Sequence, residues 1–488
     1  MASKIPLGAV AGVVGFLVLV EVTSGILQGY YTPLLTDIAR FLRIHDADVN
    51  WFEGAQLMVS ALVVPMLAKL GDMIGHKKIL LVSTALTAIA SIGIAFAPNF
   101  WVFLIFWAFQ GFYVVWLPLE VALIYSRSRN NPNAAALTRK AAGLLVAGLE
   151  LGAIAGALGG AAIFGALPGQ LWLVLLIPAL CVVACFFVIL FGVKESPDQT
   201  GGTLDYWGLV LVSVALLVLT AGLTFMRTTG PGNWLPWTAI ALGVLLFIPF
   251  VRYELRQNDP LIDIRMFAKK NMWPVQVTAG LFGVSILGAQ APLSTFARTD
   301  PEVNGYGLGA TTGQTSILIG IYIISLVVGA LLFPVVARLI PPRRVLMGAS
   351  LLIAIGFFLF LPFHDSYLNL LMNIGIAGIG SGALVAALPA AAAAVAPRGQ
   401  TGVATGLTNT TKTVGGAIAS CVFGIALLSY IASPVAGEAE NTAASLEGYF
   451  TVWIVCGATA LVAAVLLLFV PKNAFEDVPA EPIVAELR

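Results

Sequence analysis

Long apolar runs separated by short polar breaks follow one another along almost the whole chain. The hydrocarbon core of a bilayer is about 30 Å thick, so a helix that crosses it needs about 20 mainly apolar residues. Applied along the sequence, this criterion predicts fourteen membrane-spanning helices and an all-α integral membrane protein. The predicted spans are residues 7–31, 50–70, 78–98, 100–126, 138–165, 169–193, 205–227, 235–254, 271–293, 313–339, 344–362, 367–396, 401–431 and 449–471.

The composition excludes a set of soluble domains. Hydrophobic residues make up 59% of the 488 residues and charged residues only 10%, whereas soluble domains carry about 25% charged residues. The formal net charge is +1, so the chain as a whole has no basic excess for binding nucleic acid. We therefore expect the lipid bilayer to surround most of the surface, and we expect no nucleic acid as a partner.

Basic residues are unevenly distributed between the two sides of the predicted membrane. With fourteen spans both termini lie on the same side, and placing them in the cytoplasm puts all but five of the 25 Lys and Arg residues on the inner side. This bias is typical of cytoplasmic loops and predicts a multi-pass plasma (inner) membrane protein with both termini cytoplasmic. The exceptions are Arg40, Arg43, Arg227 and Arg298 on the outer side and Lys412 within a span.

The stretch LAKLGDMIGHKKIL, residues 67–80, is predicted to be the inner connection between spans 2 and 3. Gly75 allows a tight turn, and Asp72 is placed to accept hydrogen bonds from free amides at a helix N-terminus. Lys77 and Lys78 would anchor the loop at anionic lipid. An ordinary loop of the basic inner side remains an open alternative.

The same stretch resembles the loop signature between spans 2 and 3 of the major facilitator superfamily, G-x-L-A-D-x-x-G-R-[KR]-[KR]. Four positions match and three depart: the matches are Asp72, Gly75, Lys77 and Lys78, and the departures are Ala68, Met73 and His76. The resemblance implies that the four matching residues form a conformational latch between two halves of the protein on the cytoplasmic side. It says nothing about the substrate.

Glycine recurs every fourth residue along predicted span 5, at Gly148, Gly152, Gly156 and Gly160. Such a stripe allows close backbone contact between helices. The segment also resembles the glycine-rich antiporter motif of the superfamily, G-x8-G-x3-G-P-x2-G-G. Its spacing is matched by Gly143, Gly152, Gly156 and Gly160, with Ala157 in place of the proline and Ala161 in place of the last glycine. The resemblance implies a tightly packed helix interface that favours exchange, and packing of small residues without that function is the alternative.

Span 4 departs from a further pattern of family exporters. Many of them carry R-x-x-Q-G there, with the arginine linked to proton coupling, whereas this chain reads WAFQG. Trp107 takes the arginine position, and Gln110 and Gly111 remain. If transport is coupled to protons, another residue must carry the proton.

The order of six spans, two spans and six spans resembles the fourteen-span drug:proton antiporter branch of the superfamily. The stretches DPLIDIRMF, residues 259–267, and TGLTNTTKTVGGAIAS, residues 405–420, resemble segments of that branch. The resemblance implies two pseudo-symmetric six-helix bundles with an extra helix pair between them. The implied divisions are an N-terminal bundle at 1–195, a linker helix pair (spans 7 and 8) at 196–256, a C-terminal bundle at 257–471 and a cytoplasmic tail at 472–488.

Four glutamates lie within predicted spans, all of them in the first six. A charge at the bilayer centre costs at least ~2.5–3.5 kcal/mol on insertion scales, so these residues are expected to face a polar cavity and to take part in proton coupling. Structural alternatives remain open: headgroup solvation for Glu53, pairing with inner basic residues for Glu120, and a buried hydrogen bond for Glu21 and Glu150. The candidates for proton coupling are thus Glu21, Glu150, Glu120 and Glu53.

Lys412 lies in span 13 and is opposite in charge to the glutamates of the first six spans. We hypothesise that it pairs with a glutamate in a shared cavity, and that breaking the pair frees the two halves to rock. Polar and aromatic residues are expected to line this cavity, although aromatic residues also pack in cores or face lipid. The candidate cavity residues are Lys412, Asn409, Gln110, Trp107, Tyr30, Tyr31, Tyr113 and Trp116.

No enzyme signature accompanies these features. The three histidines lie far apart in sequence, no metal-spaced cluster, nucleophile elbow or phosphate loop occurs, and neither a cofactor nor a metal is expected. The sequence predicts a monomeric secondary active transporter that uses protons to export amphipathic drugs or natural products by alternating access. A facilitator or symporter of a small metabolite is the alternative, because the arginine and the proline of the exporter motifs are missing.

Overall fold

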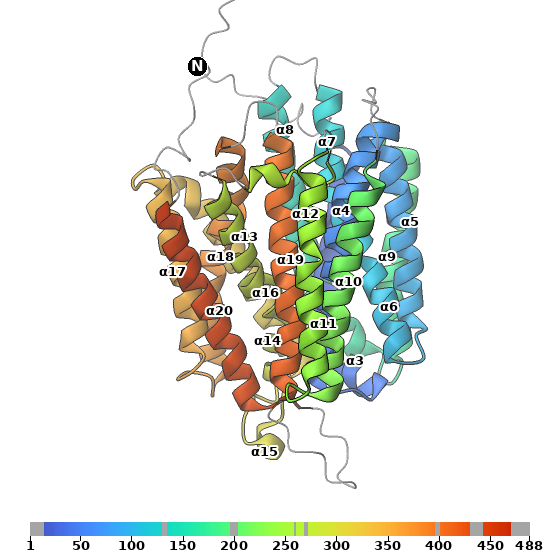
Figure 1. Cartoon of the computed structure of the whole chain (residues 1–488). Helices are drawn as coiled ribbons and strands as arrows, with labels where there is room; N and C mark the ends of the chain where they lie inside the picture. The colour runs from blue at the N-terminus through green and yellow to red at the C-terminus, as the bar shows by residue number, and fades with distance from the viewer. Residues whose placement is uncertain are drawn as a thin grey trace, which may run out of the picture.

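The computed structural model describes residues 14–128, 134–195, 204–257, 260–267, 272–395, 401–429 and 443–469 (Figure 1). All regular structure in these ranges is helical, as predicted. Two predicted features lie outside the described residues: the start of span 1 at residues 7–13 and the tail at 472–488. The inner end of the molecule is the end that carries the predicted cytoplasmic loops, and the outer end is the opposite one.

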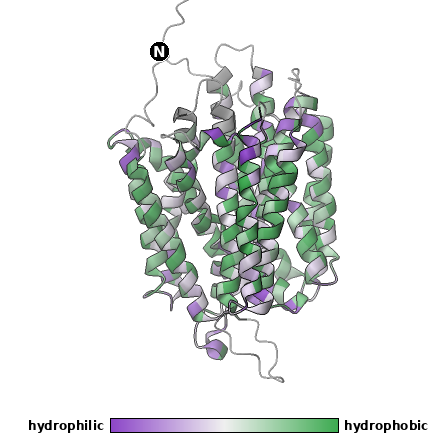
Figure 2. Ribbon diagram, viewed as in Figure 1, coloured by the Kyte–Doolittle hydropathy of each residue, from purple (hydrophilic) through white to green (hydrophobic). Residues whose placement is uncertain are grey.

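Within the described ranges, thirteen helical runs are long and apolar enough to cross a membrane. They coincide with predicted spans 2 to 14, and Figure 2 shows their apolar middle sections with hydrophilic residues gathered toward the two ends. The chain is therefore a multi-pass membrane protein. The runs are Asp46–Ile74, His76–Ala95, Phe100–Arg127, Lys140–Ala166, Leu171–Gly192, Tyr206–Thr229, Trp234–Glu254, Trp273–Arg298, Thr312–Val336, Pro342–Leu359, Tyr367–Pro389, Gly406–Leu428 and Leu446–Phe469.

The helices from α2 to α9 pack mainly with one another and are called the first half. α2 lies against α8, α5 against α9, and α4 against α5 and α6. Their buried side chains form one apolar cluster that includes Phe52, Phe103 and Trp116. The bounds are α2 Leu17–Tyr30, η1 Thr32–Leu34, α3 Leu35–Leu42, η2 Asp46–Asp48, α4 Val49–Ile74, α5 His76–Ala95, α6 Phe100–Gln110, η3 Gly111–Val115, α7 Trp116–Ser128, α8 Ala134–Ala166 and α9 Leu171–Gly192.

The helices from α13 to α20 form a second packed group, called the second half. α13 lies against α19 and α20, α16 against α18, and α17 against α18 and α20. The linker helices, α10 to α12, come between the two groups in the chain. The bounds are α10 Tyr206–Thr229, α11 Trp234–Leu245, α12 Phe247–Glu254, η4 Ile264–Met266, α13 Trp273–Leu287, α14 Gln290–Arg298, α15 Pro301–Asn304, α16 Thr312–Val336, α17 Pro342–Leu359, α18 Tyr367–Val395, α19 Thr401–Leu428, α20 Leu446–Leu466 and η5 Leu467–Phe469.

Two spans continue as helices beyond their predicted outer ends. Span 1 is predicted to end at residue 31, but the helical path continues through η1 and α3 to Leu42. Span 9 is predicted to end at residue 293, but α14 continues to Arg298. The apolar windows end early because Asp37 and Arg298 are charged, yet these two side chains are largely buried against each other. Arg298 therefore belongs to the last turn of a helix.

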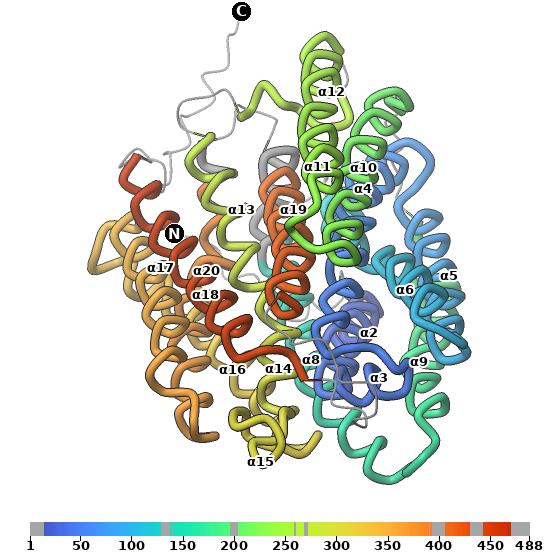
Figure 3. Tube along the Cα trace, turned by 60° about the horizontal axis from the view of Figure 1, so that its bottom comes forward, coloured from blue at the N-terminus to red at the C-terminus, as the bar shows by residue number. Residues whose placement is uncertain are grey.

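The two halves meet along several seams. α4 packs on α19, α8 packs on α16, and η1 and α3 contact α14 at the outer end. α10 lies along both α4 and α19, and Figure 3 shows the linker helices beside these two. Leu57 and Met58 of α4, Leu216 of α10 and Ala417 of α19 share one buried apolar cluster. The linker helices therefore cover the seam between α4 and α19.

Candidate functional site

Glu21 on α2 and Glu120 on α7 face each other inside the first half. Both side chains are fully buried, and each carboxyl group lies within interaction range of the other. None of their four carboxyl oxygens makes a hydrogen bond of normal length to a described residue. Because burying a carboxylate without a partner is costly, this pair is suited to holding a proton between its two carboxyl groups.

Tyr113 connects this pair with a third carboxyl group, that of Glu53 on α4. Tyr113 lies on η3, is buried, and is within electrostatic range of both Glu53 and Glu21. The 3-10 segment begins at Gly111, where a Cβ would lie only 2.6 Å from a backbone carbonyl oxygen of α4. This close approach brings η3 against α4. Tyr113 is thus a predicted cavity aromatic that lies within electrostatic range of two candidate carboxyl groups.

Glu150 on α8 and Lys412 on α19 belong to opposite halves and lie within electrostatic range of each other. Tyr322 on α16 is also within range of Glu150. Glu150, Lys412 and the nearby Asn409 are each half-buried. In the described part of the chain no ion pair of contact length joins Glu150 to Lys412. Glu150 and Lys412 therefore interact between the two halves beside the place where α8 packs on α16, here called the central seam, and a bound group there would change their interaction.

The polar stretch of α19 around Lys412 is held by α13. Gln276, buried on α13, donates from Nε2 to the Thr408 hydroxyl at 3.0 Å and accepts from the Thr411 hydroxyl at 3.3 Å. The two helices are in backbone contact there, because a Cβ on Gly283 would lie 1.9 Å from the Lys412 carbonyl oxygen. Sequence reasoning missed Gln276, for which the available signal was a glutamine inside an apolar run.

The four glycines of span 5 all face α2. A Cβ added at Gly152 would lie 2.2 Å from a carbonyl oxygen of α2, and those at Gly156 and Gly160 would lie 2.7 and 2.6 Å from others. At Gly148 the nearest atom of α2 would be 3.1 Å away and belongs to a side chain. The stripe therefore brings α8 into backbone contact with α2, and these two helices carry two of the candidate glutamates.

Gln110 lies in the packed interior of the first half, where its amide is fully engaged. It accepts a hydrogen bond from Gln56 Nε2 at 3.2 Å. Its own Nε2 donates to the Tyr31 hydroxyl at 3.2 Å and to the Ser91 hydroxyl at 2.9 Å. Gln110 thereby joins the end of α2 to α4, α5 and α6.

The other aromatic candidates of spans 1 and 4 also lie in helix packing. Trp107 is buried and in ring contact with Tyr31 and Phe52. Tyr30 is buried and donates from its hydroxyl to a backbone carbonyl oxygen of α9 at 2.8 Å. Trp116 is fully buried at the start of α7. The ring contacts and hydrogen bonds of these residues are with other residues of the first half.

The connection between α4 and α5 is a single residue, Gly75. Its φ of 117° lies in the region that favours glycine, and a Cβ there would lie 2.7 Å from Oε2 of Glu195. Glu195 follows α9 and accepts hydrogen bonds from the backbone N–H groups of Lys77 at 2.9 Å and Lys78 at 3.2 Å. The N-terminus of α5 is thus capped by a carboxylate, an arrangement that the helix dipole favours.

Asp72 lies in the last turn of α4 and pairs with His76 at 3.0 Å. The sequence places it near the start of the connection, but α4 continues to Ile74, and two amides of the α5 N-terminus donate to Glu195. Lys77 adds a hydrogen bond from Nζ to a carbonyl oxygen of α9 at 2.9 Å. Sequence reasoning missed Glu195, for which the available signal was an acidic residue directly after span 6 on a side rich in basic residues.

The outer end is closed by polar contacts that sequence reasoning also missed. Arg298 of α14 pairs with Asp37 of α3 at 2.7 Å and donates to the Thr312 hydroxyl at 2.7 Å. The Ser294 hydroxyl donates to the Thr32 carbonyl oxygen at 2.6 Å. The bonds of Arg298 to Asp37 and of Ser294 to Thr32 join α14 of the second half to α3 and η1 of the first, and the Thr312 hydroxyl of α16 donates to Asp37 Oδ2 at 3.5 Å. The available signal was Arg298 itself, a basic residue on the predicted outer side.

A further ion pair anchors the linker helices to the first half. Arg227 Nε of α10 lies 2.6 Å from Asp48 Oδ1, and its guanidinium lies over the Phe100 ring at 5.1 Å from the ring centre. Stacking of a guanidinium on an aromatic face is attractive. The outer end of α10 is therefore held at the beginnings of α4 and α6.

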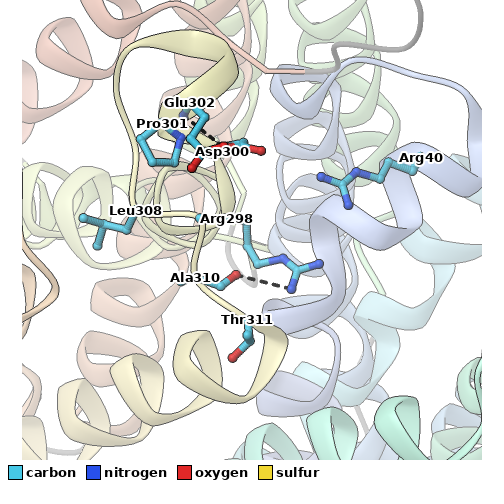
Figure 4. A pocket seen from close by; sticks show the side chains of 9 residues that line it. Arg40, Arg298, Asp300, Pro301, Glu302, Leu308, Ala310 and Thr311 are labelled. Carbon is cyan, nitrogen blue, oxygen red and sulfur yellow. Dashed lines mark hydrogen bonds between the residues drawn. The ribbon is translucent and has the colours of Figure 1, made fainter.

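A pocket of about 540 Å³ opens beside Arg298 at the outer end (Figure 4). Arg40 of α3 lies on one side of it, and the chain that follows α14 lies on the other. Its lining contains two basic and two acidic residues, so its charge selects neither cations nor anions. The lining residues are Arg40, Arg298, Asp300, Pro301, Glu302, Leu308, Gly309, Ala310 and Thr311.

The chain combines many membrane-spanning helices, buried ionisable groups and opposite charges on the two halves. This combination is typical of a membrane transport protein. The chain belongs to the Major Facilitator Superfamily, whose family profile matches residues 17–255 and 271–485. It is a membrane transporter and not an enzyme.

Three relatives show how widely the named functions vary. The uncharacterized MFS-type transporter YwoD of Bacillus subtilis (strain 168) is 27% identical over 446 residues, covering 87% of this chain and 90% of the relative. A multidrug resistance protein B homolog of Mycobacterium tuberculosis (strain CDC 1551 / Oshkosh) is 26% identical over 399 residues, covering 79% and 70%. The uridine/deoxyuridine transporter of Lactococcus lactis subsp. cremoris (strain MG1363) is 24% identical over 292 residues, covering 57% and 58%.

Proposed function

We propose that this chain is a proton-coupled exporter of amphipathic small molecules that works by alternating access. The buried Glu21–Glu120 pair carries the proposal, because two carboxyl groups enclosed together repel when both are charged and favour a shared proton. The similarity to a multidrug resistance protein B homolog supports an amphipathic cargo. The basic-residue pattern supports a plasma (inner) membrane location with cytoplasmic termini.

The moving parts in this proposal are the divisions inferred from the chain order. Residues 1–195 and 257–471 rock as two bundles, and residues 196–256 form the linker between them. The contacts of α4 with α19 and of α8 with α16 are the seams that open and close. Because the Asp37–Arg298 ion pair joins the halves at the outer end, the described state belongs to the part of the cycle in which the outer end is closed.

The coupling step is proposed to act on the two opposite charges at the central seam. Glu150 and Lys412 attract each other across α8 and α19 when both are charged. Protonation of Glu150, or a charged cargo group placed between them, weakens this attraction and frees the seam. Tyr113 lies within electrostatic range of both Glu53 and Glu21 and is proposed to offer a route for protons to the buried pair.

The cargo contacts are proposed to centre on the same seam. Lys412, Asn409 and Tyr113 are the predicted cavity residues that lie near candidate carboxyl groups or beside the seam. The other predicted cavity residues are proposed to hold the helices of the first half in position, since their side chains are engaged in hydrogen bonds or ring contacts there. This second set consists of Gln110, Trp107, Tyr30, Tyr31 and Trp116.

A facilitator or symporter of a small metabolite is the second candidate. The relative named as a uridine/deoxyuridine transporter favours it, and so does the tryptophan at position 107, where many family exporters carry an arginine. In this case the buried glutamates would drive uptake or serve only in helix packing.

Transport by the purified chain in lipid vesicles under an imposed proton gradient separates the two candidates. We expect ethidium, an amphipathic cation, to be moved only while the gradient lasts, and Glu21→Gln and Glu120→Gln to abolish that dependence equally because the two residues act as a pair. Glu447→Gln, an exposed glutamate at the start of α20, is the matched control and should transport normally.

Two outcomes would reject the exporter. One is uptake of radiolabelled uridine without movement of ethidium, which favours the metabolite transporter. The other is undiminished, gradient-dependent ethidium transport by both pair variants, which removes the pair from the mechanism.

A further inference from the structure

A second pair of buried acidic residues lies at the inner end of the linker helices, on elements that do not carry the Glu21–Glu120 pair. Asp205 is the N-cap residue of α10, and Glu254 is the last residue of α12. Asp205 is 9% exposed and Glu254 is 1% exposed. Neither the latch nor the central seam accounts for two acids enclosed at this place.

The oxygens of this pair converge on one backbone position. Asp205 Oδ1 accepts hydrogen bonds from the Gly208 N–H at 2.8 Å and from the Tyr253 hydroxyl at 3.1 Å. Asp205 Oδ2 and both carboxyl oxygens of Glu254 have no hydrogen-bond partner within the described part of the chain. A Cβ on Gly208 would lie 2.3 Å from Glu254 Oε1 and 2.6 Å from Asp205 Oδ2. The unpartnered oxygens of the two acids are therefore neighbours over Gly208.

The surroundings of the pair identify the ligand by its size and charge. The groups that act on Glu254 are Asp205, Tyr253 on the same helix and Lys69 on α4, while Arg265 of η4 is bound to carbonyl oxygens just beyond α12. A calcium ion takes six to eight oxygen ligands, and the described residues contain no group of three or more His, Cys, Asp or Glu side chains that could hold a metal ion. A proton fits, because it converts two repelling carboxylates into one short hydrogen bond.

We propose that Asp205 and Glu254 form a binding site for one proton at the inner end of the linker helices. When the proton leaves, the second negative charge draws Glu254 toward Lys69 and toward the backbone amides of Leu261 and Ile262, which lie close to it without completing a hydrogen bond of normal length. Lys69 precedes the latch residue Asp72 by less than one turn of α4. Proton uptake from the inner side thus adjusts the packing of the linker against the helix that carries the latch.

The test uses the full chain in lipid nanodiscs without cargo, so its result does not depend on what the protein transports. Infrared difference spectra are recorded across pH in a Glu21→Gln/Glu120→Gln background, which removes the other buried pair. We expect a carboxylic acid C=O band that titrates with pH, that is lost in Glu254→Gln and in Asp205→Asn, and that persists in the exposed-site control Glu447→Gln. Persistence of the band in both linker variants, or its absence from the background protein, overturns the proposal.

A distance measurement keeps the proposal testable if one linker variant does not fold. Spin labels at Arg256→Cys beyond α12 and Ile74→Cys at the end of α4, both exposed positions, report the separation of the two inner ends once the native cysteines are replaced. We expect this separation to shorten as pH rises in the parent protein. Glu254→Gln, which imitates the protonated acid, should keep the low-pH separation at every pH. A separation that does not respond to pH in the parent protein contradicts the proposed site.

Discussion

Arg298 Nη2 lies 2.7 Å from Asp37 Oδ1, and this ion pair joins α14 of the second half to α3 of the first at the outer end. The two side chains are only 10% and 12% exposed. A charge that is buried in this way depends on its partner, since the loss of one member leaves the other charged in a poorly hydrated place. In the proposed transport cycle, the pair stabilises the state in which the outer end is closed.

Asp37→Asn is expected to weaken the closed outer end by about 3–5 kcal/mol, the usual cost of leaving one charge of a buried pair without its partner. The measurement is the rate at which a thiol reagent added from the outer side labels Ser294→Cys, a buried position beside the pair. Labelling should accelerate in Asp37→Asn and return toward the parent rate in Asp37→Asn/Arg298→Gln. The exposed neighbour Arg40 supplies the control variant, Arg40→Gln, and equal labelling in all variants would contradict the expected closure.

Gly152→Ala is expected to destabilise the protein by about 1–3 kcal/mol, because the added methyl group would lie 2.2 Å from a carbonyl oxygen of α2 and force the helices apart. Gly159→Ala on the same helix is a matched control, since nothing lies within 4 Å of a Cβ there. We expect the control to leave stability unchanged or to raise it by up to about 1 kcal/mol through helix propensity. Thermal unfolding in detergent compares the two, and equal losses would argue against a specific α2–α8 contact.

His45 is expected to make the stability of the outer end depend on pH. Burial lowers the pKa of His45 below its ordinary value, Asp48 opposes this effect and Arg227 reinforces it. The unfolded chain therefore binds the proton first, so the stability contribution is complete above ~6.5 and is lost as pH falls below that value. We expect the melting temperature to drop less between about pH 7.5 and about pH 5.5 in His45→Gln than in the parent. Identical pH profiles would show that His45 does not contribute.

Glu195→Gln is expected to cost about 1 kcal/mol of stability, because the N-terminus of α5 loses a charged acceptor but keeps a neutral one. Glu195→Ala should cost more, since it leaves the N–H groups of Lys77 and Lys78 without their acceptor. Hydrogen exchange at the first turn of α5 should accelerate in the same order. Unchanged exchange in the alanine variant would show that water replaces the cap at no cost.

Asp72→Asn is expected to shift the conformational balance toward the inward-open state, as the resemblance of this loop to the superfamily latch implies. Cysteine probes placed on the two faces of the seam report the balance through their accessibility from each side. Asp72→Asn should raise the accessibility from the inner side and lower it from the outer side. Probes that react as in the parent protein would count against a latch at this position.

The positions of the membrane spans could be predicted from hydropathy, because lipid imposes the same apolar requirement on every crossing helix. Where the prediction fell short, the cause was buried charge. Asp37 and Arg298 end the apolar windows of spans 1 and 9, although each neutralises the other inside the protein. Such an ion pair cannot be recognised from the linear sequence, since its members lie far apart in the chain.

The candidate site could be predicted as a set of unusual residues but not as an arrangement. Four glutamates stood out in apolar spans, yet nothing local indicates that Glu21 meets Glu120 while Glu150 faces Lys412. The sequence does not show whether Gln110 or Trp107 lies on a packed face or on a cavity face of its helix, because polar and aromatic residues occur on both. Helical periodicity cannot assign the face in a helix that is apolar all round.

The ion pair between Arg227 and Asp48 has a mechanical consequence. It ties the outer end of α10 to the beginning of α4, while the side of the same helix rests on α19. If the second half moves relative to the first, the linker helices then move with the first half. The displacement appears as sliding between α10 and α19. The sliding surface is thus the apolar cluster around Leu216 and Ala417, and among the described residues no hydrogen bond or ion pair between α10 and α19 has to break for one helix to move along the other.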